Sequence, residues 1–292
     1  MPLLCPNCRA AIDPASGECG HGHAFAEVDG VLPLLAEGFG RRLAAYEAVL
    51  SAARRAEGKH LLDVTAYEQL PFSRAAEALP GMRLEWRLRR YDLAVIEKLL
   101  AGQKAQRVLD VGAWNGWLSH RLAAAGHQVT AVDYFADAHD GLRARRFYRA
   151  QWRAIQMDLR DPSVLDEQFD AIVVNRCLAF ATDPAAYLQS LKPRVAPGGR
   201  LIVTGLQFFW WPAAKARRVA AERARHAEQH GFELFLFPTR GYLDRADHQC
   251  LRLHGLRLHA YPQLWAANLK ARCMPSRPRH AYGVWVNTGA AL

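Results

Sequence analysis

The sequence lacks long apolar runs, and it contains fewer acidic than basic residues. No stretch approaches the roughly 20 apolar residues of a membrane span, and the N-terminus does not show the charged-then-apolar pattern of a signal peptide. We therefore expect a cytoplasmic protein without a membrane span. Asp and Glu number 28 against 38 Lys and Arg, which gives a net charge of +10. Such a surface attracts anions, including nucleic acid, without selecting among them.

Cysteine is also scarce, and half of it lies at the start of the chain. Of the six cysteines, three fall within the first nineteen residues, a clustering that indicates a metal site and not a disulfide network. Cys5 and Cys8 form one C-x2-C pair, and Cys19 and His23 form a second, with His21 as the weaker alternative to His23. Paired thiolate and imidazole ligands suit tetrahedral zinc, and four protein ligands leave no open position. We expect a structural zinc ion.

The most informative stretch begins at residue 107. A short apolar run at 107–111 is followed by a glycine loop, a helical stretch, and a second apolar run at 128–132 that ends in Asp133. This order predicts a strand, a tight loop, a helix and a second strand. A dinucleotide fold requires G-x-G-x-x-G, but Trp114 and Trp117 stand at two of the three glycine positions. Pyrophosphate binding is therefore disfavoured.

The loop Asp110-Val-Gly112-Ala-Trp-Asn-Gly116 resembles motif I of the class I S-adenosylmethionine-dependent methyltransferases. Asp133, Asp158 and Pro197-Gly-Gly199 follow in the order in which that class places its other landmarks. The resemblance implies an α/β fold, with a Rossmann-like seven-stranded sheet and helices on both faces. It also implies that the last strand runs antiparallel beside the fifth, and that the cofactor is S-adenosyl-L-methionine.

The resemblance further implies which residues hold the cofactor. Asp110 would hold the methionine ammonium, Gly112 and Gly116 would let that end approach, Asp133 would take the ribose hydroxyls, and Asp158 would accept the adenine amino group. The full set expected to contact the cofactor is Asp110, Gly112, Ala113, Trp114, Gly116, Asp133, Tyr134, Asp158, Leu159 and Asn175.

The chain is expected to divide into three regions, of which the last contains this motif. Residues 1–37 resemble the zinc ribbon that stands before the methyltransferase domain of bacterial rRNA guanine methyltransferases, and the stretch at 30–35 is expected to be one of its short strands. Residues 38–105 are expected to form a helical linker or lid, and 106–292 the methyltransferase domain. Within that domain we also expect a basic helix at 138–150.

The expected lid contains two helical patterns, at 41–57 and 82–100. Leu84 and Leu88 lie on the predicted apolar face of the second helix. In the methyltransferase class that the chain resembles, helices ahead of motif I often cover the cofactor or shape the substrate pocket. The same role is expected here.

The methyl acceptor is less well defined. Asn175-Arg-Cys-Leu178 departs from the Asn/Asp-Pro-Pro-aromatic signature of enzymes that methylate amino groups of nucleic-acid bases, and Cys177 lacks the Pro-Cys pair of RNA 5-methylcytosine enzymes. We expect a small-molecule acceptor. The alternatives are an rRNA or tRNA substrate, and a non-catalytic protein that binds S-adenosylmethionine or serves as an interaction partner. Tyr242, Asp183 and His248 lie near the expected pocket, but no motif singles out a catalytic base.

Overall fold

The computed structural model describes residues 3–102 and 105–289, and its centre is a mixed β-sheet. Seven strands follow the expected pattern in the spatial order β4-β3-β2-β5-β6-β9-β8, with β9 antiparallel to both of its neighbours. Their bounds are β2 Arg107–Val111, β3 Gln128–Asp133, β4 Arg153–Met157, β5 Phe169–Asn175, β6 Val195–Phe209, β8 Arg257–Ala260 and β9 Arg279–Val286. The predicted α/β fold and the antiparallel last strand are confirmed.

The sheet of the described residues has nine strands, so the expected count of seven is wrong. The short β7 (Leu243–Asp244) pairs with the end of β6, and β1 (Val31–Leu34) adds to β4 in parallel. Val31 and Leu34 are only 2% and 1% exposed. β1 therefore forms part of the main sheet, because it covers the edge of β4, whose backbone groups would otherwise lack partners.

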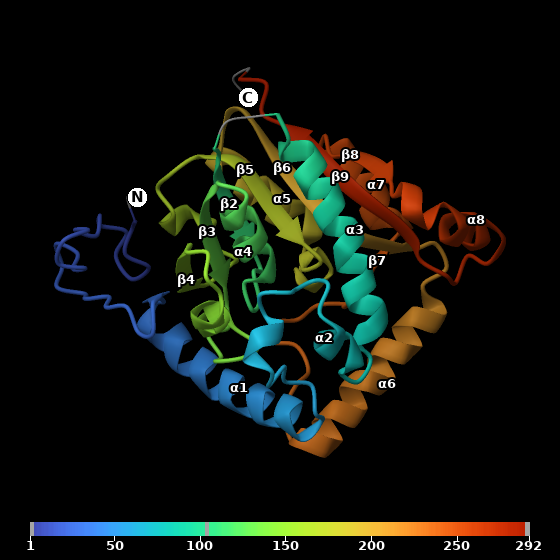
Figure 1. Ribbon diagram of the computed structural model, residues 1–292, viewed down its shortest axis with the longest axis horizontal. Helices are drawn as coiled ribbons and strands as arrows, with labels where there is room; N and C mark the ends of the chain where they lie inside the picture. Colours follow the sequence, from blue (N-terminus) through green and yellow to red (C-terminus); the bar gives the residue numbers. More distant parts are fainter. Residues whose placement is uncertain (1–2, 103–104, 290–292) are drawn as a thin grey trace.

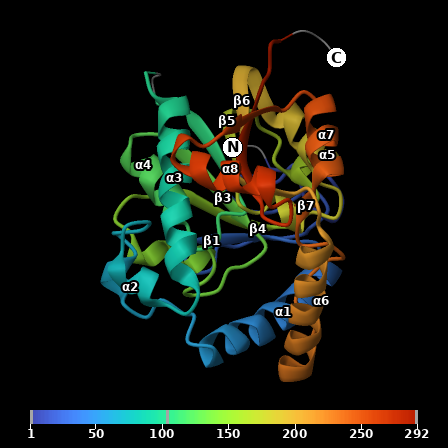
Figure 2. The same ribbon diagram turned by 90° about the vertical axis from the view of Figure 1, so that its right-hand side faces the viewer.

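Helices cover both faces of the sheet, as predicted (Figures 1 and 2). Side chains alternate along β2, so Val108 packs with Trp117 on one face, while Leu109 packs in the core that contains Leu188 on the other. The helices are α1 Glu37–Ala56, α2 Arg74–Ala78, α3 Met82–Leu100, α4 Trp117–Ala124, α5 Pro184–Leu191, α6 Ala213–His230, α7 Arg245–Leu253 and α8 Trp265–Cys273. None of these helices is long and apolar enough to cross a membrane.

Two local expectations differ from the structure. The basic stretch at 138–150 is not an α-helix and contains only a 3-10 helix at Leu142–Phe147. Asp137 accepts backbone N–H bonds from His139 and Asp140, both at 2.8 Å, and this side-chain turn competes with a helix start. The buried face of α3 is also rotated from the predicted one. Leu84 is 52% exposed, while Asp92 is 1% exposed.

Candidate functional site

The glycine loop between β2 and α4 is shaped by the side chains around it. Gly112 and Gly116 have φ angles of +72° and +77°, which strain residues with a Cβ. A Cβ at Gly112 would lie 2.7 Å from Cys177 Sγ, and a Cβ at Gly116 would lie 2.5 Å from Cζ2 of Trp152. Both glycines are therefore required by the packing of the loop itself, a reason that the motif alone does not reveal.

Two buried carboxylates lie near the carboxyl ends of the neighbouring strands β2 and β3. Asp133 accepts the backbone N–H of Trp114 at 2.7 Å and that of Phe135 at 2.9 Å. Burial raises the pKa of Asp133 to about 6, although these N–H groups oppose the rise. Each of its oxygens has a further lone pair that can accept another donor.

Asp110 is less well satisfied than Asp133. Its Oδ2 accepts the Ser119 hydroxyl at 2.6 Å, but its Oδ1 is buried and has no hydrogen-bond partner among the described residues. Burial raises the pKa of Asp110 to about 7, the hydroxyl of Ser119 lowers it, and the nearby charge of Asp133 raises it further. A buried acceptor without a partner is costly, so a donor or a cation placed there would be favourable.

Trp114 of the loop and Trp117, the first residue of α4, both pack against Trp86 of α3. The Trp114 ring stacks on Trp86 of α3 at 5.5 Å between centroids, and the guanidinium of Arg89 lies over both rings. Trp117 is 2% exposed in the core beside Trp86. Trp114 reaches Asp133 through its backbone N–H alone, and Ala113 donates its N–H to the carbonyl of Val132.

The structure places Asp158 just after β4, at the same edge of the sheet. Its carboxylate accepts Nη2 of Arg160 at 2.6 Å and Nε at 2.9 Å, and the Tyr134 hydroxyl lies 3.4 Å away. Arg160 in turn lies over the ring of Phe237 at 3.7 Å. Leu159 is buried at 8% exposure. A ligand at Asp158 would have to share the carboxylate with Arg160.

Aromatic rings from distant segments cover this end of the site. Phe39 of α1, Tyr134 after β3 and Phe237 after α6 lie within 5.4 to 6.2 Å of one another, measured between ring centroids. These two segments, α1 and the stretch after α6, form a cover over the site and are joined by a hydrogen bond from a side chain to the backbone. The Tyr46 hydroxyl donates to the carbonyl of Leu234 at 2.7 Å. The edge that carries Asp133 and Asp158 is thus roofed by α1 and by the segment after α6.

Asn175, the last residue of β5, belongs to a buried polar network that includes Thr204 in the neighbouring strand β6. Its amide donates to Thr204 Oγ1 at 2.7 Å and to Asp92 at 3.3 Å. Asp92 also accepts the Tyr261 hydroxyl at 2.6 Å and an N–H of Arg176 at 3.3 Å. Sequence reasoning missed this network. Asp92 lies four residues from both Leu88 and Ile96, and an acidic residue inside that buried helical row was the available signal.

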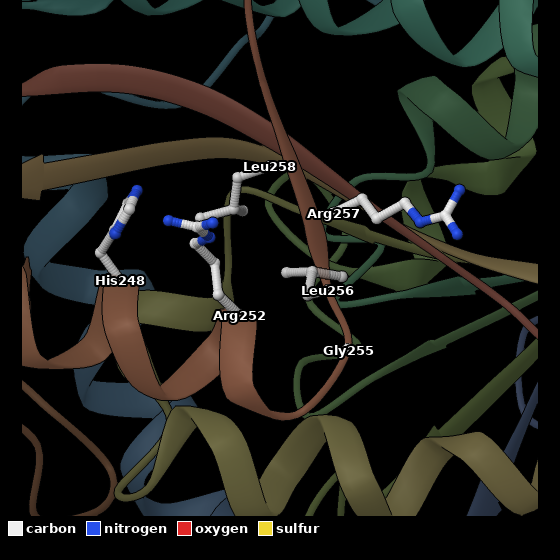
Figure 3. Close-up of a pocket in the computed structure, with 6 residues that line it drawn as sticks. All are labelled: His248, Arg252, Gly255, Leu256, Arg257 and Leu258. Carbon is white, nitrogen blue, oxygen red and sulfur yellow. The ribbon is translucent and has the colours of Figure 1, made fainter.

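Two of the residues considered as bases, Asp183 and His248, have other structural positions. Asp183 caps the start of α5, where it accepts the N–H groups of Ala185 and Ala186. His248 lines a hollow of about 580 Å³ between α7 and β8, together with Arg252 and Arg257 (Figure 3). That hollow shares no lining residue with the glycine loop.

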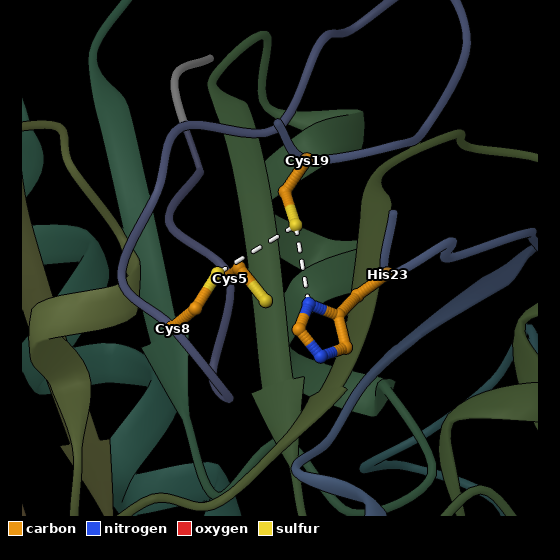
Figure 4. Close-up of side chains that lie close together, drawn as sticks. All are labelled: Cys5, Cys8, Cys19 and His23. Atoms are coloured by element: carbon orange, nitrogen blue, oxygen red, sulfur yellow. Dashed lines mark hydrogen bonds between the residues drawn. The ribbon is translucent and has the colours of Figure 1, made fainter. Parts of the chain in front are cut away.

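The cysteine cluster comes together as the spacing predicted (Figure 4). The ligand atoms of Cys5, Cys8, Cys19 and His23 all lie within 4.8 Å of one another, and His21 is not part of the group. Cys19 Sγ is 3.6 Å from Cys8 Sγ and 3.3 Å from Nδ1 of His23. Zinc with bonds of about 2.3 Å to sulfur places tetrahedral sulfurs about 3.8 Å apart, so these separations fit.

The charge state of Cys19 also suits a metal ligand. Burial raises the pKa of its thiol, but hydrogen bonds from the backbone of His21 and the side chain of His23 outweigh burial and lower the pKa to about 6. A thiolate is the form that binds metal.

The strand order, the antiparallel β9 and the acidic residues near the carboxyl ends of β2 and β3 define a class I S-adenosylmethionine-dependent methyltransferase domain. Residues 82–252, more than half of the chain, match the model of a family described as a methyltransferase domain. The chain belongs to this family.

Curated relatives carry related names. The chain is 34% identical over 135 residues to the ubiquinone biosynthesis O-methyltransferase of Xanthomonas oryzae pv. oryzae strain PXO99A, covering 44% of this chain and 51% of the relative. The enzyme of that name from Actinobacillus pleuropneumoniae serotype 5b is 25% identical over 199 residues, covering 62% and 82%. The chain thus spans about half the length of the first of these relatives.

A solved structure also aligns with the chain. The magnesium protoporphyrin IX methyltransferase from Synechocystis PCC 6803 matches with a TM-score of 0.48 and 17% identity. The alignment covers 84% of this chain and 99% of that one.

Proposed function

We propose that this protein transfers a methyl group from S-adenosylmethionine to a small molecule. The observation that carries the proposal is the pair of buried carboxylates, Asp110 and Asp133, at the carboxyl ends of adjacent parallel strands, where ligands of open α/β sheets bind. Membership of the methyltransferase family and the names of the related O-methyltransferases support the same activity.

The residues present fit the proposed cofactor. The partnerless Oδ1 of Asp110 would accept an N–H of the methionine ammonium, and the open lone pairs of Asp133 would accept the ribose hydroxyls. Asp158 and Tyr134 would meet the adenine under the rings of Phe39 and Phe237. These rings exclude water from the adenosyl end.

When bound, S-adenosylmethionine supplies a methyl group already activated by the sulfonium. The chain's own contribution is then chiefly to position the reactants and keep water out. We place the acceptor beside the end of β5, next to Gly112 and Cys177. The network of Asn175, Asp92 and Tyr261 would hold that wall rigid, because its buried polar groups partner one another.

Calorimetric titration of the purified full chain with S-adenosylmethionine tests the cofactor part of the proposal. We expect one binding site per chain. Labelled-methyl transfer from the bound cofactor into a metabolite extract, in parallel with total RNA, tests the acceptor. A chain that is folded and zinc-loaded yet binds no S-adenosylmethionine contradicts the proposal.

A structured RNA is the second candidate acceptor, and one observation favours it. The hollow between α7 and β8 is lined by His248, Arg252 and Arg257, and the side chain of Arg257 extends away from the other two in Figure 3. Neither arginine has an ion-pair partner within the described ranges. Such side chains can bind backbone phosphates, and the affinity would then fall steeply with added salt. Label entering RNA and not the metabolite extract would favour this candidate.

We also propose that Cys5, Cys8, Cys19 and His23 bind a structural zinc ion as an N-terminal ribbon. The support is the convergence of four suitable ligand atoms without any open position. The division into a ribbon at 1–37, a lid at 38–105 and a methyltransferase domain beyond it stays a proposal. A cytoplasmic location is part of the same proposal, because a thiolate cluster requires reduced cysteines.

A further inference from the structure

A second cluster of metal-ligating side chains lies where the C-terminal ends of α1 and α6 meet, at the lower edge of Figure 1. Glu57 follows the last residue of α1, and His226 and His230 occupy successive turns at the end of α6. One ligand atom from each lies within 4.8 Å of the other two. None of these residues takes part in the proposed methyl transfer.

The two imidazoles lack the partners that buried polar groups normally have. Nε2 of His226 and Nε2 of His230 are both buried without a hydrogen bond to any described residue. His226 is 8% exposed, and the edge-on ring of Phe232, 4.6 Å away between centroids, restricts its orientation. Nε2 of His230 faces Oε1 of Glu57 at 3.5 Å, near enough to share one ion. Buried ring nitrogens without partners are unfavourable, and one ion would satisfy both.

The ends of the two helices favour a cation here, although the nearby ammonium of Lys59 opposes one. Two helices end at this point, and the carbonyl end of a helix carries partial negative charge. Lys59 holds the other oxygen of Glu57, Oε2, at 2.5 Å. That contact fixes the carboxylate and leaves Oε1 directed at His230. The i, i+4 spacing of the histidines places both rings on one face of α6.

We propose that Glu57, His226 and His230 bind one divalent transition-metal ion of the zinc class. Two imidazole nitrogens and one carboxylate oxygen form a ligand set that zinc accepts, with solvent at the fourth position. The ion joins the end of α1 to the end of α6. It is separate from the cysteine cluster, which lies before α1 in the chain.

The position of the ion indicates what it does. α1 and the segment after α6 are the two parts of the cover, joined by Tyr46 to Leu234 at 2.7 Å and by Arg42 to the carbonyl of Leu236 at 3.0 Å. The metal adds a link between the end of α1 and the end of α6, directly before the segment that these two contacts hold. It thereby fixes the roof over Asp133 and stabilises the folded chain.

Cobalt(II) titration of the full-length chain, after its metal has been removed, tests the proposal. Thiolate ligands give cobalt an intense charge-transfer band, whereas His and Glu ligands do not, so the two sites can be distinguished. Wild type should bind one equivalent of cobalt(II) per chain that does not add to the thiolate charge-transfer band. His226→Gln and, separately, His230→Gln should weaken that equivalent by at least about tenfold. Neither change should alter any thiolate band. Glu228→Gln, on the exposed face of the same helix, is the matched control and should bind like wild type.

A melting curve provides the second measurement. Zinc should raise the melting temperature of wild type by more than it raises that of His230→Gln, and circular dichroism without metal should show that both are folded. Wild type that binds no equivalent outside the thiolate band overturns the proposal, as does unchanged binding in both histidine variants. These results do not depend on S-adenosylmethionine, so failure here is distinguishable from failure of the proposed activity.

Discussion

Replacing Asp110 with asparagine should change stability and cofactor binding in opposite directions. The carboxyl is 1% exposed, and burial raises its pKa from 3.8 to about 7. Asparagine is nearly isosteric, and its carbonyl can still accept the hydroxyl of Ser119. The substitution therefore removes a buried charge with little change in packing.

The sign of the effect follows from the two pKa values. The unfolded carboxyl ionises near 3.8 and the folded one near 7, so the folded protein holds an extra proton between these pH values. The contribution of Asp110 to the free energy of unfolding should therefore decrease as the pH rises from 4 to 7, by about 4 kcal/mol at most. Asp110→Asn should lose this part of the decrease, and at pH 8 it should be at least as stable as wild type.

Cofactor binding should respond in the opposite sense. An amide carries no negative charge to attract the ammonium. A hydrogen bond to a charged group contributes about 1.5 to 3 kcal/mol, so Asp110→Asn should bind S-adenosylmethionine about ten- to a hundredfold more weakly at pH 8. Wild type should also lose affinity as the pH falls below 7, because the protonated carboxyl has no charge to offer.

Urea unfolding at pH 5, 6, 7 and 8, with calorimetry at the same pH values, measures both effects. Ser119→Ala is the informative control. Without the hydroxyl that lowers it, the pKa of Asp110 should rise, and both pH transitions should move upward. If Asp110→Asn retains the full pH dependence of wild type, Asp110 is not its source and the reasoning fails.

Three further changes test other parts of the site. Asp133→Ala should weaken S-adenosylmethionine binding by tenfold or more in calorimetry, because it removes the proposed ribose acceptor; unchanged affinity would refute that role. Cys19→Ser should lose the thiolate-bound zinc in metal analysis, and a chelator should then lower the melting temperature of wild type by more than it lowers that of the variant. Tyr261→Phe should destabilise the chain by about 1 to 3 kcal/mol in urea unfolding, because it leaves Asp92 Oδ1 without its 2.6 Å donor. A loss below a few tenths of a kcal/mol would mean that the contact is dispensable.

The strands and the metal cluster were predictable because their signals are local. The apolar run before Gly112 and the acidic residue that ends the next run lie within one βαβ unit, and a parallel register then brings them to one edge. Cys5 and Cys8 are likewise brought together by a short turn. In each case the spacing along the chain nearly determines the spacing in three dimensions.

The pairing partner of the extra strand β1 could not be predicted from local spacing. The run at 30–35 has the composition of a strand, and a strand forms there. Its partner is residues 154–157 of β4, more than a hundred positions away, because the edge of β4 is otherwise uncovered. Composition predicts that a strand forms, but the choice of partner depends on which edge the finished sheet leaves open.

The partners of Asp92 in the site could not be predicted from the sequence either, and their arrangement has a consequence for function. It lies on α3, while its partners Asn175 and Tyr261 come from β5 and from the turn after β8, so no sequence spacing relates them. The network is buried, so moving α3 away from the sheet would leave Asp92 and Arg176 as separated charges in the interior. α3 also carries Trp86, on which the loop residue Trp114 stacks. The helix that supports the cofactor loop is therefore anchored to the proposed acceptor wall, and a substitution at Asp92 should disturb both sides of the site together.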